Sequence, residues 1–171
     1  SGEGPEPLYD TNARINPPLR GENDRRALVR GVNEGLVDAI ATDHAPHARE
    51  DKLCEFDLAA PGISCIETAL STVLALVERG ELDLGRALAA LTAGPVRAFD
   101  LGRRVAGLGA LTPGVSSDIL VFDPAARWTV DTEKFASKGR NTPLQGVELP
   151  GEVRAVVLNG ALALHTEAAN G

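Results

Sequence analysis

The chain has 171 residues, a formal net charge of -7 and a hydrophobic content of 43%, values typical of a folded globular protein. The negative charge argues against nonspecific nucleic-acid binding, and no apolar run reaches the ~20 residues that a membrane-spanning helix needs. Two cysteines, Cys54 and Cys65, are too few for a disulfide framework, so we predict reduced thiols and a cytoplasmic location.

The first elements predicted along the chain are a short strand and a helix. The strand ends near Ile15, because the two prolines after Asn16 stop any β-ladder or helix. Asn23 or Asp24 can cap the helix, and Gly35 fits the C′ position that ends it. The apolar stripe of this helix comprises Ala27, Leu28 and Val32.

Residues 36–47, LVDAIATDHAPH, are the stretch around which the prediction is built. Residues 36–41 form a short apolar run that predicts a strand buried on both faces. Pro46 prevents a helix from continuing this strand, so an acid and two imidazoles gather at its carboxyl end. In parallel α/β folds that end carries the chemistry. Together with the preceding strand and helix, the order predicts a parallel βαβ unit.

The rest of the chain predicts one long loop, helices and then short strands. Residues 48–62 form a long polar loop, and Ser64 to Glu67 has the S-x-x-E pattern of a capping box that opens a helix. A further helix runs from about Leu84 to the Gly94-Pro95 pair. Beyond it, we expect a strand over residues 119–122 that ends at Asp123-Pro124, and a type I′ hairpin at Asn159-Gly160. This change from predicted helices to short predicted strands indicates an α/β part over residues 1–102 and a small β-rich domain over residues 103–171.

Asp43, His44 and His47 are the first candidates for chemistry. Asp43 lies at the mouth of the predicted strand and is interpreted either as a metal ligand that also handles protons, or as a cap or ion-pair partner. For His44 a structural role with satisfied ring nitrogens is favoured. His47 follows the proline and is interpreted as a substrate contact. A zinc site from Asp43, His47 and Cys54 is a further alternative, although their spacing is not a regular metal-ligand pattern.

Asn16 and the Pro61-Gly62 pair are the second group of candidates. The Asn16 carboxamide both donates and accepts, and the prolines beside it hold it rigidly, which suits recognition of a small polar ligand. The alternative is an ordinary turn residue. At Pro61-Gly62 the backbone can approach a ligand closely. The alternative is an ordinary Pro-Gly turn in a loop.

Four motifs occur in one order along the chain: NPPLR at 16–20, IATDHAPH at 40–47, APGISCIETAL at 60–70 and LTAGPVRAFDL at 91–101. Together they resemble the carboxyl-terminal part of bacterial dihydroorotases of the amidohydrolase superfamily. GALTPGVSSDILVFDP at 109–124 and FASKGRNTP at 135–143 are similar to that family's closing β domain. The ATDHAPH motif alone would leave hydantoinase-like or allantoinase-like enzymes open.

The resemblance implies the last strand-helix units of a metal-dependent (β/α)8 barrel plus a small β domain. It implies interconversion of N-carbamoyl-L-aspartate and L-dihydroorotate in pyrimidine synthesis. Asp43 would bind one or two zinc ions and carry the proton, Asn16 and His47 would hold the substrate, and the backbone of Pro61 and Gly62 would contact its ring. Cys65 departs from the family pattern, where a small residue, usually glycine, is expected.

The H-x-H metal motif of the family is absent from this sequence, and a single carboxylate cannot hold a catalytic zinc, which needs about three protein ligands. We therefore expect the amino-terminal part of the barrel, with the other ligands, to lie outside this chain, which alone would be inactive. A homodimer or an aspartate transcarbamoylase is a further expected partner. The alternatives are a related cyclic amidohydrolase and a noncatalytic dihydroorotase-like scaffold.

Overall fold

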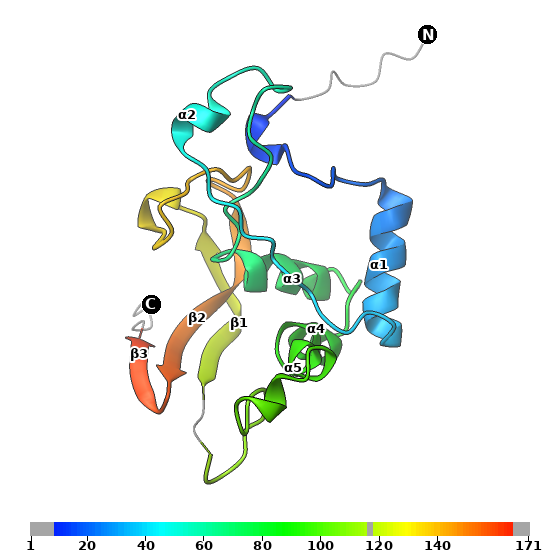
Figure 1. The fold of residues 1–171 in the computed structure, drawn as a ribbon, viewed down its shortest axis with the longest axis vertical. Coiled ribbons are helices and arrows are strands. Elements are labelled where there is room, and N and C mark those ends of the chain that lie inside the picture. The colour runs from blue at the N-terminus through cyan, green and yellow to red at the C-terminus, as the bar shows by residue number, and fades with distance from the viewer. Residues whose placement is uncertain (1–8, 116–117, 166–171) are drawn as a thin grey trace. The chain divides into compact units, whose positions relative to one another are not determined.

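The computed structural model describes residues 9–115 and 118–165, which belong to two compact units (Figure 1). The first unit comprises residues 9–20, Thr42–Thr68 and Thr129–Val147. The second unit comprises Gly21–Ala41, Ala69–Trp128 apart from residues 116–117, and residues 148–165. Both units are assembled from segments far apart in the sequence. The predicted boundary divides the chain once, between residues 102 and 103, whereas each compact unit combines several separate segments. The predicted division into an α/β part and a β-rich domain stays a prediction.

Helices form most of the second unit: α1 (Glu22–Glu34), α3 (Ala69–Glu78), α4 (Leu84–Leu91) and α5 (Ala93–Ala98). The predicted first helix is confirmed, and Gly35 ends it with a φ of 74°. Its N-cap is Gly21, so the prediction of Asn23 or Asp24 was wrong by two residues or more. Leu28 is 61% exposed, whereas Val32 is buried and Val29 packs against the core. The stripe predicted for this helix was therefore only partly correct.

The apolar core of the second unit joins these helices. Its buried residues are Val32, Val73, Leu82, Ala87 and Ala90, and Val37 and Ile40 pack against them. Small residues allow close approach, since a Cβ added at Gly94 would lie 1.9 Å from the carbonyl oxygen of Asp38. The Ile40 N–H donates to the carbonyl of Ala90 at 2.9 Å, which ties the segment after α1 to α4.

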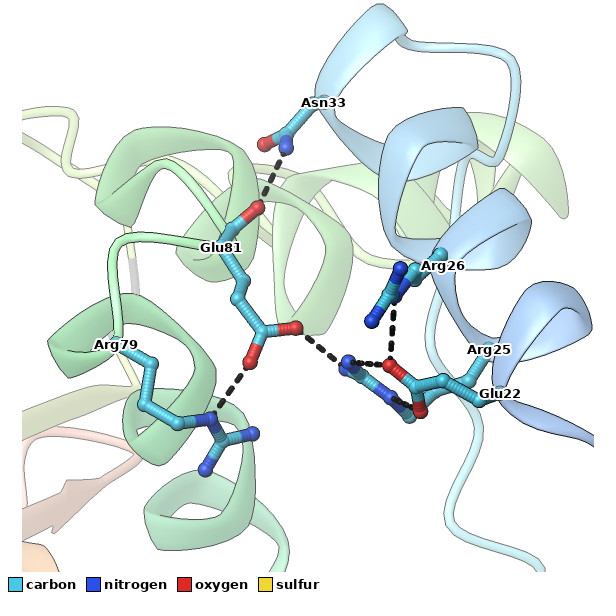
Figure 2. Close-up of polar contacts among 6 residues, drawn as sticks. All are labelled: Glu22, Arg25, Arg26, Asn33, Arg79 and Glu81. Carbon is cyan, nitrogen blue, oxygen red and sulfur yellow. Dashed lines mark hydrogen bonds and ion pairs between the residues drawn. The ribbon is translucent and has the colours of Figure 1, made fainter.

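An ion-pair network on the second unit connects the start of α1 with the turn after α3 (Figure 2). The carboxylate of Glu22 accepts from Arg25 at 2.7 Å and from Arg26 at 2.8 Å. Glu81 accepts from Arg25 at 2.5 Å and from Arg79 at 2.6 Å, and its backbone carbonyl accepts from Asn33 at 2.9 Å. Hydrogen bonds from Arg25 and then Arg26 lower the pKa of Glu22 to about 2. The network links α1 to the turn after α3 through charged side chains.

Three strands form one sheet in the order β1 (Ile119–Thr129), β2 (Glu148–Leu158) and β3 (Ala161–His165). β2 and β3 pair antiparallel, and Asn159 and Gly160 have φ values of 49° and 76°, which confirms the predicted type I′ hairpin. The strand predicted to end at Asp123-Pro124 is longer, because β1 continues to Thr129. The Asp123 carboxylate accepts from the N–H groups of Ala125 and Ala126 at 3.0 and 3.3 Å, beside the position where Pro124 supplies no N–H.

Helix α3 packs on β2 through one close approach. Gly151 has a φ of 84°, and a Cβ there would lie 2.2 Å from Leu74, which is 3% exposed. The Ser71 hydroxyl donates to the Gly151 carbonyl at 3.0 Å and accepts from the Trp128 indole at 2.9 Å. The Ser71 hydroxyl of α3 therefore bonds to both β1 and β2.

The strands predicted near Ile15 and over residues 36–41 are not formed. Residues Thr11–Ala13 make a 3-10 helix, and no strand is assigned to residues 36–41. A strand requires a hydrogen-bonded neighbour, and within the described ranges the only β-pairing near this point is an isolated parallel bridge between His44 and Ile63. The remaining short elements are α2 (Arg49–Lys52), within the predicted loop, η2 (Leu101–Arg103) and η3 (Thr132–Lys134). No helix in the described ranges has the length and apolar character to cross a bilayer.

Candidate functional site

His47, Pro61 and Gly62 lie together in the first unit. The Nε2 atom of His47 is 3.1 Å from the Pro61 carbonyl oxygen. Because a carbonyl only accepts, a hydrogen bond there places a proton on Nε2. Gly62 has a φ of 153°, and a Cβ at this position would lie 2.8 Å from His47 Nε2 and 2.6 Å from the Ala45 Cβ. The backbone at Gly62 therefore approaches His47 and Ala45 so closely that a glycine is required, and the approach to a ligand predicted for Pro61-Gly62 stays a prediction.

Asn141 holds these segments together. Its Oδ1 accepts from the His47 N–H at 2.9 Å, and its Nδ2 donates to the carbonyls of Ala45 and Gly62, both at 3.0 Å. The side chain is 5% exposed, so each amide atom has a partner in a buried setting. Sequence reasoning did not single out Asn141. Its only signal was its place in the FASKGRNTP motif, and an asparagine in a loop is by itself an ordinary turn residue.

His44 is a structural histidine, as its favoured interpretation predicted. Its Nδ1 accepts from the backbone N–H groups of Cys65 and Ile66 at 3.1 and 3.2 Å. Its Nε2 lies 3.3 Å from the hydroxyl of Ser137. With two donors on Nδ1, the neutral ring carries its proton on Nε2. Both ring nitrogens are therefore used in joining residues 44, 65–66 and 137.

The capping box predicted at Ser64 and Glu67 is not formed, because α3 begins only at Ala69. The Ser64 hydroxyl instead donates to the Gly139 carbonyl at 3.1 Å. The Glu67 carboxylate accepts from the N–H groups of Ala136 and Ser137 at 3.0 and 2.9 Å. Both side chains thus form hydrogen bonds with the backbone of the 135–139 loop instead of with the first turn of α3.

Asp43 and Asn16 are both exposed. Asp43 has a φ of 48°, in the left-handed region that aspartate tolerates better than most residues. Its charge acts on Cys65: burial first, and the Asp43 carboxylate second, raise the pKa of this thiol. Asn16 precedes Pro17 with a cis peptide bond. In the part of the chain that the structure describes, no hydrogen bond or ion pair joins either residue to His47, Pro61 or Gly62.

Lys52 is a buried cation that the sequence did not mark. It is 5% exposed, and its ammonium donates to the carbonyls of Ala60 at 2.6 Å, Thr11 at 2.9 Å and Arg14 at 3.5 Å. Burial, and then the charge of Arg14, lower the pKa of this amine. The Arg14 guanidinium in turn donates to the Ala59 carbonyl. These bonds tie residues 48–62 to the segment that leads into Asn16.

A match to the family model described as the amidohydrolase family covers residues 11–163, most of the chain. This chain belongs to the amidohydrolase family. It is 46% identical over 159 residues to a dihydroorotase of Anaeromyxobacter sp. (strain K), covering 93% of this chain and 35% of the relative. It is 42% identical to a dihydroorotase of Desulforapulum autotrophicum, covering 93% and 36%. The chain therefore spans about a third of the length of these relatives.

Solved structures agree with this family. The fold matches a D-hydantoinase (dihydropyrimidinase) from Thermus sp. with a TM-score of 0.79 and 26% identity, over 91% of this chain and 34% of that one. It matches an L-hydantoinase (dihydropyrimidinase) from Arthrobacter aurescens with a TM-score of 0.83 and 24% identity, over 95% and 36%. The fold of this amidohydrolase chain thus corresponds to about one third of a complete family member.

The amidohydrolase family is generally metal-dependent. The described residues contain no group of three or more His, Cys, Asp or Glu side chains placed to hold an ion. The alternative zinc site of Asp43, His47 and Cys54 is therefore not formed. A catalytic zinc takes about three protein ligands, so the described residues do not supply a complete metal site.

Proposed function

We propose that this chain is the carboxyl-terminal portion of a dihydroorotase, which interconverts N-carbamoyl-L-aspartate and L-dihydroorotate in pyrimidine synthesis. The observation that carries the proposal is the series of relatives at 40–46% identity, matched over 89–93% of this chain, which are dihydroorotases. In this proposal residues 1–102 supply the last strand-helix units of a (β/α)8 barrel, and residues 103–171 supply the small β domain. The hydantoinase matches, each covering about a third of a chain, support a partial barrel.

The proposal gives roles to five residues. Asp43 is exposed and free of a hydrogen bond within the described chain, so its carboxylate is available to take up a proton and return it to the ring nitrogen. Asn16 and His47 hold the substrate, and the backbone at Pro61 and Gly62 contacts its ring. The fixed contact between His47 and Pro61 supports this arrangement, because it presents one imidazole and one backbone turn at the same place.

Metal binding in this proposal needs residues beyond those described. Asp43 would be one ligand of a centre with one or two zinc ions, and the amino-terminal part of the barrel would supply the others. Bound zinc would polarise the amide carbonyl and supply hydroxide near neutral pH. A further partner of the complete enzyme would be a second copy of the chain or an aspartate transcarbamoylase, and a cytoplasmic location stays a prediction.

A related cyclic amidohydrolase of the hydantoinase or allantoinase type is the second candidate function. The observation that favours it is the close fold match to D- and L-hydantoinases. The sequence relatives at higher identity favour dihydroorotase instead. A noncatalytic dihydroorotase-like scaffold is the third candidate, and the lack of a complete metal site in the described residues is compatible with it.

Grafting this chain in place of the matching third of the Anaeromyxobacter dihydroorotase tests the proposal. We expect the hybrid to hydrolyse dihydroorotate, Asp43→Asn to abolish turnover and Asn16→Ala mainly to raise KM. Asp57→Asn is the matched control, since Asp57 is another exposed acid of the first unit. Turnover of hydantoin without turnover of dihydroorotate would establish the second candidate. A folded, zinc-loaded hybrid inactive on both substrates would establish the third.

A further inference from the structure

A cavity of about 360 Å³ lies within the first unit, beside His47, Lys52 and Asn141. This volume is at the lower end of the range for small-molecule sites. The cavity is lined by Thr11, Asn12, His47, Ala48, Arg49, Lys52, Leu53, Glu133, Lys138, Arg140 and Asn141.

The charges around this cavity are predominantly positive. Arg49, Lys52, Lys138 and Arg140 line it, against the single carboxylate of Glu133. The whole chain carries a formal net charge of -7, so this concentration of cations is opposite to the chain as a whole. Like charges gathered around one hollow repel each other unless an anion lies among them. The cavity therefore offers a favourable potential to an acidic ligand.

Two of the four cations already have partners. Lys52 donates to three backbone carbonyls, and Arg140 donates to the carbonyls of Phe135 and Ser137 and lies 4.0 Å from Glu133. Arg49 and Lys138 are exposed, and among the described residues neither side chain forms a hydrogen bond or an ion pair. The side chains of Arg49 and Lys138 are therefore the ones available to a ligand. They lie 89 positions apart in the sequence, and a hydrogen bond between His47 and Asn141 joins the two segments that carry them.

We propose that this cavity binds a small oxyanion, a carboxylate or phosphate group on a metabolite-sized molecule, with Arg49 and Lys138 as its charged contacts. Arg49 can form a forked pair with such a group, and Lys138 supplies a point charge. Asn12 also lines the cavity and carries a side-chain amide. The cavity shares His47 with the proposed substrate site, but its proposed charged contacts, Arg49 and Lys138, have no role in the proposed function and need no metal. Anion binding here is therefore tested separately from turnover of the hybrid enzyme.

Calorimetric titration of the 171-residue chain with malonate and with inorganic phosphate, at ionic strength held constant with NaCl, tests this proposal. We expect saturable binding of at least one of the two at one site per chain. Preference for malonate would assign the site to carboxylates, and preference for phosphate to phosphate esters. Absence of saturable binding of both anions by the folded chain would overturn the proposal.

Paired variants identify the site. Arg49→Gln with Lys138→Gln should weaken binding by roughly tenfold or more, as expected for loss of hydrogen bonds to charged groups. Arg103→Gln with Lys134→Gln removes the same charges from exposed positions that do not line the cavity, and should leave affinity unchanged. Circular dichroism checks that all variants fold. Equal affinity in the two double variants would show a nonspecific charge effect and overturn the assignment.

Discussion

The two units bury different kinds of side chain. Among the described residues, six of the seven buried polar side chains belong to the first unit, namely Lys52, Ser64, Thr68, Thr132, Asn141 and Thr142. Seven of the ten buried hydrophobic residues belong to the second unit, namely Val32, Val73, Leu74, Leu82, Ala87, Ala90 and Leu149. The second unit is thus stabilised mainly by apolar burial, and the first by hydrogen bonds from side chains to loop backbone.

This difference bears on where function lies. All five residues predicted for the site, Asn16, Asp43, His47, Pro61 and Gly62, belong to the first unit. Apolar packing tolerates exchange among side chains of similar volume, whereas a buried amide bonded to three backbone groups specifies one loop geometry. A loop that must present an imidazole and a backbone turn at fixed positions therefore needs the second kind of interior. Substitutions in each unit should separate stability from site geometry.

The largest effect is expected from Leu74→Ala in the second unit. Leu74 is 3% exposed and packs on Gly151, so its truncation leaves a cavity between α3 and β2. We expect a loss of about 3 kcal/mol in the free energy of unfolding. Chemical denaturation measures this loss. Leu84→Ala, at a residue that is 38% exposed in the neighbouring helix, is the control and should lose much less.

Asn141→Ala should lower the free energy of unfolding somewhat less than Leu74→Ala does, but it should disturb the loop geometry around His47 and Gly62 more. It removes three hydrogen bonds and leaves the carbonyls of Ala45 and Gly62 without this donor, at an expected cost of about 2 kcal/mol. Hydrogen exchange should accelerate at the amides of Ala45 and His47 and of residues 62–64, while α3 stays protected. Equal acceleration in α3 would show that Asn141 stabilises the whole chain rather than these loops. Asn23→Ala, at an exposed asparagine of α1, is the matched asparagine control.

Lys52→Met should cost less, about 1 kcal/mol, because the apolar stem is retained while three carbonyls lose a donor. The carbonyls of Thr11 and Ala60 should then become reachable by water, and proteolysis within residues 48–62 should become faster. Lys134→Met, at an exposed lysine of the same unit, should leave the proteolysis rate unchanged. Unchanged proteolysis in Lys52→Met would contradict the tethering role.

The features that could be predicted from the sequence are those set by neighbouring residues. Gly35 ends α1 and Asn159-Gly160 closes the hairpin because each local conformation needs a positive φ. The S-x-x-E pattern failed because Ser64 and Glu67 bond to a loop about 70 positions away. Asn141 was missed for the same reason, since its partners lie 79 to 96 positions away. Residues 36–41 are apolar enough for a buried strand, but they form none, because a strand also requires a hydrogen-bonded neighbouring strand.

The smallest effect is expected at the ion pairs of the second unit, which contribute by charge rather than by burial. Folding lowers the pKa of Glu22 from 4.5 to about 2. The stabilisation of the folded state by the Glu22 carboxylate is therefore complete above pH 4.5 and is lost as the pH falls towards 2. Glu22→Gln should therefore be slightly less stable than the parent chain at pH 6, and this difference should vanish near pH 2. Thermal unfolding at several pH values measures it, with Glu34→Gln at the exposed end of the same helix as the control. Since Glu22 is exposed, 0.5 M NaCl should shrink the difference; a difference that persisted at pH 2 and in high salt would assign the contribution of Glu22 to packing instead of charge.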